Sequence, residues 1–100
     1  MFGKHSGALD VPPAAAKSRE AFEVARIWLA EGNPHVALRP DAWDAPAAWG
    51  ILLVDLARHL ALGYHQASGR PPEEALARIR AGFDAEWESA TDEPKGELQG

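Results

Sequence analysis

The strongest pattern in the chain is a run of large apolar residues at helical spacing between residues 47 and 67. These side chains recur three and four positions apart and fall within about 120° of arc on a helix. They are Trp49, Leu52, Leu53, Leu56, Leu60 and Tyr64, which we call the apolar stripe. Asp44 and Pro46 are typical of a helix start, with Asp44 as the cap, and Ser68-Gly69 of a helix end. The pattern predicts an amphipathic helix whose stripe faces a core.

A second helix is predicted after residues 70–74, which read Arg-Pro-Pro-Glu-Glu. Prolines suit the first turn of a helix, and acidic side chains are favourable near its positive end. Its apolar positions again recur at spacings of three and four: Leu76, Ile79, Phe83 and Trp87. We expect this helix to fold back against the first one.

Upstream of the helices, the pattern changes to alternation. Residues 35–39 are too few for a helix and place Val36 and Leu38 on one side of a strand. The turn-like residues 31–34 precede them, so residues 22–30 are the natural partner strand of a β-hairpin. The rival interpretation is a helix capped by Ser18 and ended at Gly32. Apolar β-branched and aromatic residues favour the strand.

These elements predict an α+β fold: a β-hairpin followed by two amphipathic helices packed on one of its faces. We expect a mobile N-terminal arm over residues 1–18, a single domain over residues 19–90 and a disordered acidic tail over residues 91–100. A two-stranded hairpin is marginal by itself, and its second face and edges need cover. We therefore expect dimerisation to complete the fold.

Size and composition support this expectation. Of the 100 residues, 20 are alanine, and Leu, Ile, Val and Phe together number only 20. A domain of about 70 ordered residues is rarely stable without a cross-link or a partner. The chain has no cysteine and so cannot form a disulfide. A homodimer is the leading expectation. Ile51 and Leu62 lie opposite the apolar stripe and add modest support for a subunit contact.

Charge and hydropathy narrow the classes of partner. The net charge of −5 argues against a nucleic-acid or anionic-membrane surface. There is neither a signal-peptide core nor an apolar run of membrane-spanning length, so we expect a cytoplasmic protein. Residues 1–71 are balanced, and the whole excess of acid lies in residues 72–100. We expect this acidic segment to be exposed to solvent or, alternatively, to bind a basic partner.

The first helix holds a group with potential chemistry: Asp55, Arg58 and His59. Asp55 and His59 are four residues apart and share a helix face, so the carboxylate could orient the histidine as a general base. The simpler interpretation is a surface ion pair, with Arg58 also within reach of Asp55. The simpler interpretation is favoured, because such pairs are common on helices.

The hairpin offers a second group: Arg26, Trp28, His35 and Arg39, which share or nearly share one face. Trp stacking and Arg pairing could hold a planar or anionic ligand. Cover of Trp28 by the N-terminal arm or a second subunit is favoured, because aromatic side chains usually serve burial first. Trp49 lies beside the helix start, whose free amide groups could receive an anion, but Asp44 is expected to occupy that place as the cap, so a structural role is favoured.

The sequence contains no motif for phosphate binding, for a serine nucleophile or for metal binding. The glycines are scattered rather than gathered in a phosphate-binding loop, the serines lie in tails or at helix ends, and no metal-ligand spacing occurs. We expect neither a cofactor nor a metal. The favoured function is a non-enzymatic binding or protein-interaction module. The alternative is a binder of a small anionic ligand or a weak acid/base enzyme using Asp55 and His59, with Arg58 or Arg39 holding the anion.

Three segments resemble a known family. They are Arg26-Ile27-Trp28, the run from His35 to Pro40, and the run from Ala48 to His59, which contains Trp-Gly and Asp-x-x-Arg-His. Over about residues 20–66 the chain resembles a family of small proteobacterial proteins classed as a domain of unknown function. The resemblance implies a small α+β unit without an assigned activity. The positions that it picks out are Trp49, Asp55, Arg58 and His59.

Overall fold

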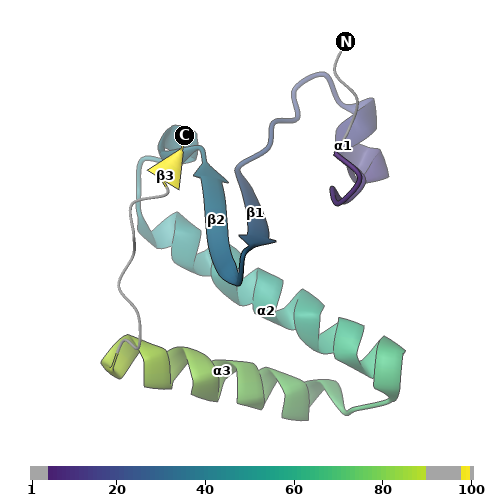
Figure 1. Cartoon of the computed structure of the whole chain (residues 1–100), viewed down its shortest axis with the longest axis vertical. Helices are drawn as coiled ribbons and strands as arrows, with labels where there is room; N and C mark the ends of the chain where they lie inside the picture. Colours follow the sequence, from purple (N-terminus) through teal and green to yellow (C-terminus); the bar gives the residue numbers. More distant parts are fainter. Residues whose placement is uncertain (1–4, 90–97, 100) are drawn as a thin grey trace.

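The computed structural model describes residues 5–89, 98 and 99, and its order of elements is a hairpin followed by two long helices (Figure 1). The elements are α1 Pro13–Lys17, β1 Ala25–Ala30, β2 Asn33–Leu38, the 3₁₀ turn η1 Pro40–Ala42, α2 Ala47–Ser68, α3 Pro72–Glu88 and β3 Leu98–Gln99. The predicted α+β class, with a hairpin and then two helices, is confirmed.

The hairpin forms as the alternating pattern predicts. β1 and β2 pair in antiparallel register, with Ile27 opposite Val36. A two-residue turn joins them, in which Glu31 has φ 54° and Gly32 has φ 80°. Positive φ at both positions gives the twist that tight hairpins prefer. The rival helix from Ser18 is wrong: the Ser18 hydroxyl accepts a hydrogen bond from the Glu20 amide (3.2 Å) in a local turn.

The two ends of the chain add short elements. α1 forms one helical turn inside the segment that we expect to be a mobile arm, and the mobility of residues 1–18 stays a prediction. Most of the expected tail, residues 91–100, lies outside the described residues. Within it, β3 is described: Leu98 and Gln99 pair in parallel with Val36 and Ala37 of β2. The sequence pattern did not predict this third strand.

Both long helices lie where the periodicity placed them. α2 ends at Gly69, whose φ of 77° is the left-handed conformation that ends helices, and its amide donates to the His65 carbonyl (2.8 Å). The expected cap at Asp44 is wrong. Pro46 occupies the N-cap position, so Asp44 lies too far upstream to accept from the first-turn amides. In the described part of the chain, no helix has the length and apolarity needed to cross a bilayer.

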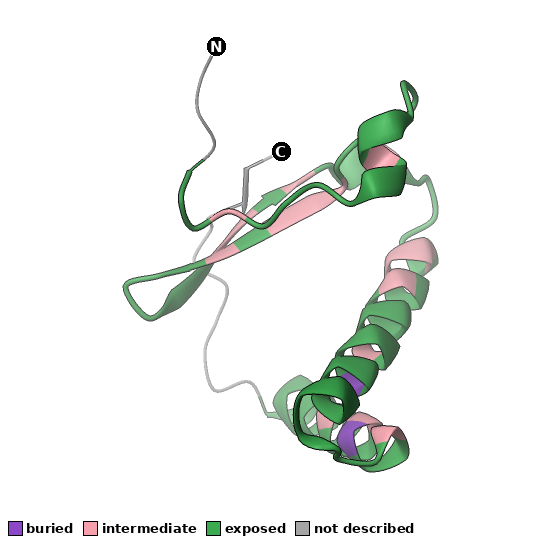
Figure 2. Cartoon of the chain, turned by 90° about the vertical axis from the view of Figure 1, so that its right-hand side faces the viewer, coloured by how far each residue is buried: buried purple, intermediate pink, exposed green. Residues whose placement is uncertain are grey.

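The packing of the helices differs from the prediction. α2 and α3 contact each other, but neither strand of the hairpin contacts either helix. The most buried positions are Ala61 on α2 and Ala75 on α3, each 2% exposed, where the two helices approach (Figure 2). On a helix, Ala61 lies well to one side of the apolar stripe. α3 therefore covers a small-residue flank of α2 and leaves the stripe outside.

Candidate functional site

The hairpin face predicted from alternation is present. The register places Trp28 opposite His35 and Arg26 opposite Ala37, so these side chains share one face of the ribbon. The Arg26 guanidinium lies 5.9 Å from the centre of the Trp28 ring. His5 of the N-terminal segment packs edge-on against the same ring, with centroids 4.9 Å apart. The arm thus covers part of the aromatic surface that a planar ligand would use.

Arg26 is paired within the chain. Its Nη2 lies 2.9 Å from Oε2 of Glu23, and its Nε donates to both oxygens of the same carboxylate at 3.0 and 3.2 Å. A forked contact of this kind is among the stronger forms of surface ion pair. Glu23 was not among the predicted residues. Its spacing three positions before Arg26 was the available signal.

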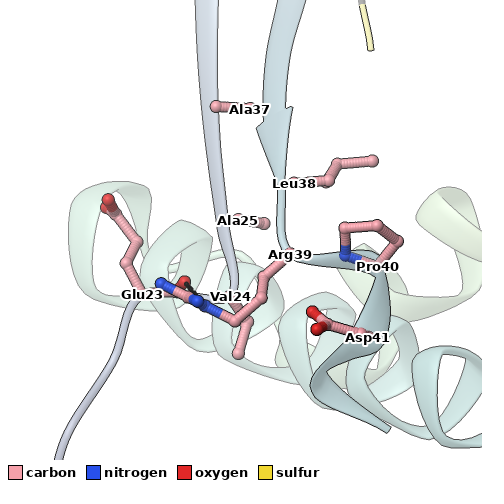
Figure 3. A pocket seen from close by; sticks show the side chains of 8 residues that line it. All are labelled: Glu23, Val24, Ala25, Ala37, Leu38, Arg39, Pro40 and Asp41. Atoms are coloured by element: carbon pink, nitrogen blue, oxygen red, sulfur yellow. Dashed lines mark hydrogen bonds between the residues drawn. The ribbon is translucent and has the colours of Figure 1, made fainter. Parts of the chain in front are cut away.

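Arg39 is held at the entrance to the hairpin. Its Nε donates to the backbone carbonyl of Glu23 (3.2 Å), and its guanidinium lies 5.2 Å from the centre of the Phe22 ring. Beside it is a hollow that Figure 3 shows between the ends of β1 and β2. The residues lining it are Glu23, Val24, Ala25, Ala37, Leu38, Arg39, Pro40 and Asp41. Two carboxylates and one engaged guanidinium line this hollow, which is a poor arrangement for an anion.

The helical group lies on the surface of α2. His59 Nε2 is 3.3 Å from Asp55 Oδ2, and both side chains are largely exposed. Arg58 is exposed on the same helix. This is the geometry of an i,i+4 surface pair, and neither residue lines the hollow beside Arg39. Because the hairpin contacts neither helix, the hairpin group and the helical group do not form one site.

Trp49 has a structural partner. Its ring packs edge-on against Trp43, with centroids 5.1 Å apart, where η1 leads into α2. Among the residues with described positions, no three His, Asp or Glu side chains are gathered so as to hold a metal ion.

The most unusual surface is the apolar stripe itself. Trp49 and Leu52 are half-buried, but the next four members are between 42% and 57% exposed: Leu53, Leu56, Leu60 and Tyr64. Of the two fully charged residues of α2, Arg58 lies opposite the centre of the stripe and Asp55 lies about 120° from it, outside the stripe. Four adjacent large apolar side chains without charge are a surface suited to protein contact. The sequence located these residues correctly but assigned them to the core.

Comparison with known proteins places the chain in a family. No curated protein matches it. A solved structure from the photosynthetic bacterium Rhodopseudomonas palustrus CGA009, provisionally described as a pyruvate dehydrogenase, is 36% identical, with a TM-score of 0.72 and 95% of each chain covered. The family model described as "Domain of unknown function (DUF5076)" matches residues 8–91. The expected resemblance to a domain of unknown function is thereby confirmed, and the chain belongs to the DUF5076 family.

Proposed function

We propose that this chain is a cytoplasmic, non-enzymatic protein-interaction module that binds through the apolar stripe of α2. The observation that supports it is the exposure of Leu53, Leu56 and Leu60 in a chain whose only buried apolar residues, within its described part, are two alanines. Exposed apolar area of this extent is costly in water and is retained where a partner covers it.

The alternative functions find less support in the geometry. An anion at the hairpin would compete with the Glu23 carboxylate for Arg26 and with the Glu23 carbonyl for Arg39. An acid/base site at Asp55 and His59 would operate in open solvent, without the enclosure that excludes water from reacting groups. The dehydrogenase description of the Rhodopseudomonas protein belongs to that protein, and no residue group described above supports carrying it to this chain.

The test compares the stripe with the other side of the same helix. Carbene footprinting with mass spectrometry measures the labelling of Leu53, Leu56 and Leu60 against Ile51 and Leu62. In the single chain Leu62 is 50% exposed, within the 42–57% of the three stripe leucines, whereas Ile51 is 73% exposed, so a covered stripe is recognised by labelling clearly below that of Leu62.

A stripe that is free in the purified chain should instead bind the hydrophobic dye 8-anilinonaphthalene-1-sulfonate. A double substitution, Leu56→Lys with Leu60→Lys, should then abolish dye binding while circular dichroism retains the helical signal. A folded chain whose stripe is neither protected from labelling nor able to bind the dye would contradict the interaction function.

A further inference from the structure

The chain exposes more surface than a self-sufficient protein of its mass. Its accessible area is 8903 Å², whereas a compact monomer of this size exposes roughly 5,500 Å². The difference, roughly 3,400 Å², is spread over the whole chain, and an interface of standard size, about 800 Å² from each partner, would remove part of it. The radius of gyration of 15.7 Å likewise exceeds the ~13 Å of a compact domain of this length. The chain has the proportions of one subunit of an assembly.

α2 is the element that such an assembly would enclose. Only Asp55 and Arg58 among its 22 residues are fully charged, and four of the six large side chains in its apolar stripe are between 42% and 57% exposed. α3 covers one flank of the helix, and the hairpin does not contact it. An apolar helix face of this width normally packs against a protein surface.

We propose that the occupant of the apolar stripe is a second copy of this chain, whose α2 packs antiparallel to the first about a two-fold axis beside Leu56. This inference rests on the proposed function and names its partner. In a two-fold interface each contact occurs twice, so the surface must be complementary to itself. With the axis between Leu56 and Ala57, Leu53 faces Leu60 and Trp49 faces Tyr64. Large side chains then meet at Trp49, Leu53, Leu60 and Tyr64, whereas Leu56 lies level with Ala57 and Leu52 with Ala61.

The distribution of charge favours this occupant. The excess acid of the chain lies in residues 72–100, which include α3, and not in α2. Pairing through α2 keeps the two acidic α3 helices on the outside, where like charges are solvated and screened. A protein selects an oppositely charged partner through charged residues at the interface. The stripe has no charged residue and therefore cannot select a partner in this way. A copy of the same uncharged stripe meets it without an electrostatic penalty.

The first experiment measures the mass in solution of the wild-type chain and of two matched variants. Sedimentation equilibrium of the full chain should give twice 10.8 kDa. Leu56→Lys should weaken association by at least about 100-fold, because a buried ammonium would face its own copy near the axis. Leu62→Lys is the control, a half-exposed leucine of the same helix on the side away from the stripe. It should leave the doubled mass unchanged.

The second experiment tests the direction of packing in the unaltered interface. Because the chain has no cysteine, Gln66→Cys provides a single attachment point for a nitroxide on the exposed surface of α2. At 1.5 Å rise per residue, antiparallel packing about Leu56 places the two labelled backbones about 30 Å apart. Parallel packing would place them about 10–20 Å apart. Double electron–electron resonance distinguishes these distances even where Leu56→Lys does not fold.

The outcomes separate this inference from the proposed function. A doubled mass with a distance near 30 Å supports the second copy as the occupant. A folded chain of single mass whose stripe binds the dye overturns the second copy and leaves the interaction function standing. A single mass with a stripe that neither binds dye nor resists labelling overturns both. A doubled mass that persists in folded Leu56→Lys, or a short distance, overturns the antiparallel interface at the stripe.

Discussion

The substitution Leu56→Ala is expected to lower the free energy of unfolding by different amounts in a monomer and in the proposed dimer. The change removes three carbon atoms, worth about 2.4 kcal/mol if all are buried, at ~0.8 kcal/mol per methylene. In the single chain Leu56 is 42% exposed, so the expected loss of unfolding free energy is about 1.4 kcal/mol. In the proposed pair the exposed remainder is also buried and a cavity forms. The expected loss then rises to the ~2–5 kcal/mol of buried leucines.

Equilibrium urea unfolding, followed by tryptophan fluorescence, measures this difference. Four tryptophans are present, one of them in the stripe. Wild type and Leu56→Ala are each unfolded at two protein concentrations about 100-fold apart. If a partner chain stabilises the fold, this 100-fold increase in protein concentration raises the free energy of unfolding by up to ~2.7 kcal/mol. We expect the wild-type midpoint to rise with concentration and the substitution to cost more than about 2 kcal/mol.

Leu62→Ala is the matched control for this measurement. Leu62 is 50% exposed and lies away from the stripe, so the same calculation gives about 1.2 kcal/mol at either concentration. A cost near 1.4 kcal/mol for Leu56→Ala, together with a midpoint that does not move with concentration, would refute the reasoning.

Three further predictions concern the chain itself, each measured as a change in unfolding free energy by the same assay. Ala61→Leu should cost ~1–3 kcal/mol, because it forces a larger side chain between α2 and α3, whereas Ala77→Leu at an exposed position of α3 should change little; equal effects would contradict the helix contact. Asp55→Asn should cost less than about 1 kcal/mol, as expected of an exposed ion pair, and a larger loss would indicate that the pair is buried in the assembly. Gly69→Ala should cost ~1–2 kcal/mol because its φ is 77°, whereas Gly82→Ala, inside a helix with open space around the added methyl group, should stabilise by up to ~1 kcal/mol.

Residue patterns predicted part of the candidate site on the hairpin. Alternation correctly placed Arg26, Trp28 and His35 on one face of the hairpin, because side chains in a strand point to opposite faces in turn. It did not identify Glu23, whose carboxylate pairs with Arg26 and whose carbonyl accepts from Arg39. Glu23 lies two residues before β1 begins, where the alternation of a strand does not fix the direction of a side chain. Its position relative to either arginine is therefore a property of the folded structure and not of the strand period.

The helical pair is simpler. Asp55 and His59 meet because residues four apart are neighbours on any helix, and the sequence alone was sufficient to predict their contact. Their exposure was not predictable in the same way. It depends on which side of α2 is covered, and that is decided by α3 and by whatever else packs against the helix.

The sequence by itself determined the main elements: a hairpin, because apolar residues alternate on both sides of a two-residue turn, and two long helices, because apolar positions recur every three or four residues. These periods follow from local geometry and need no knowledge of distant contacts. Only the tertiary structure decided what each apolar face meets. α3 approaches α2 through Ala61 and Ala75, since small residues let two backbones come close, and this crossing leaves the apolar stripe outside. Periodicity shows that a face must be covered, but the cover is a long-range property, and in this protein we propose that it comes from another molecule.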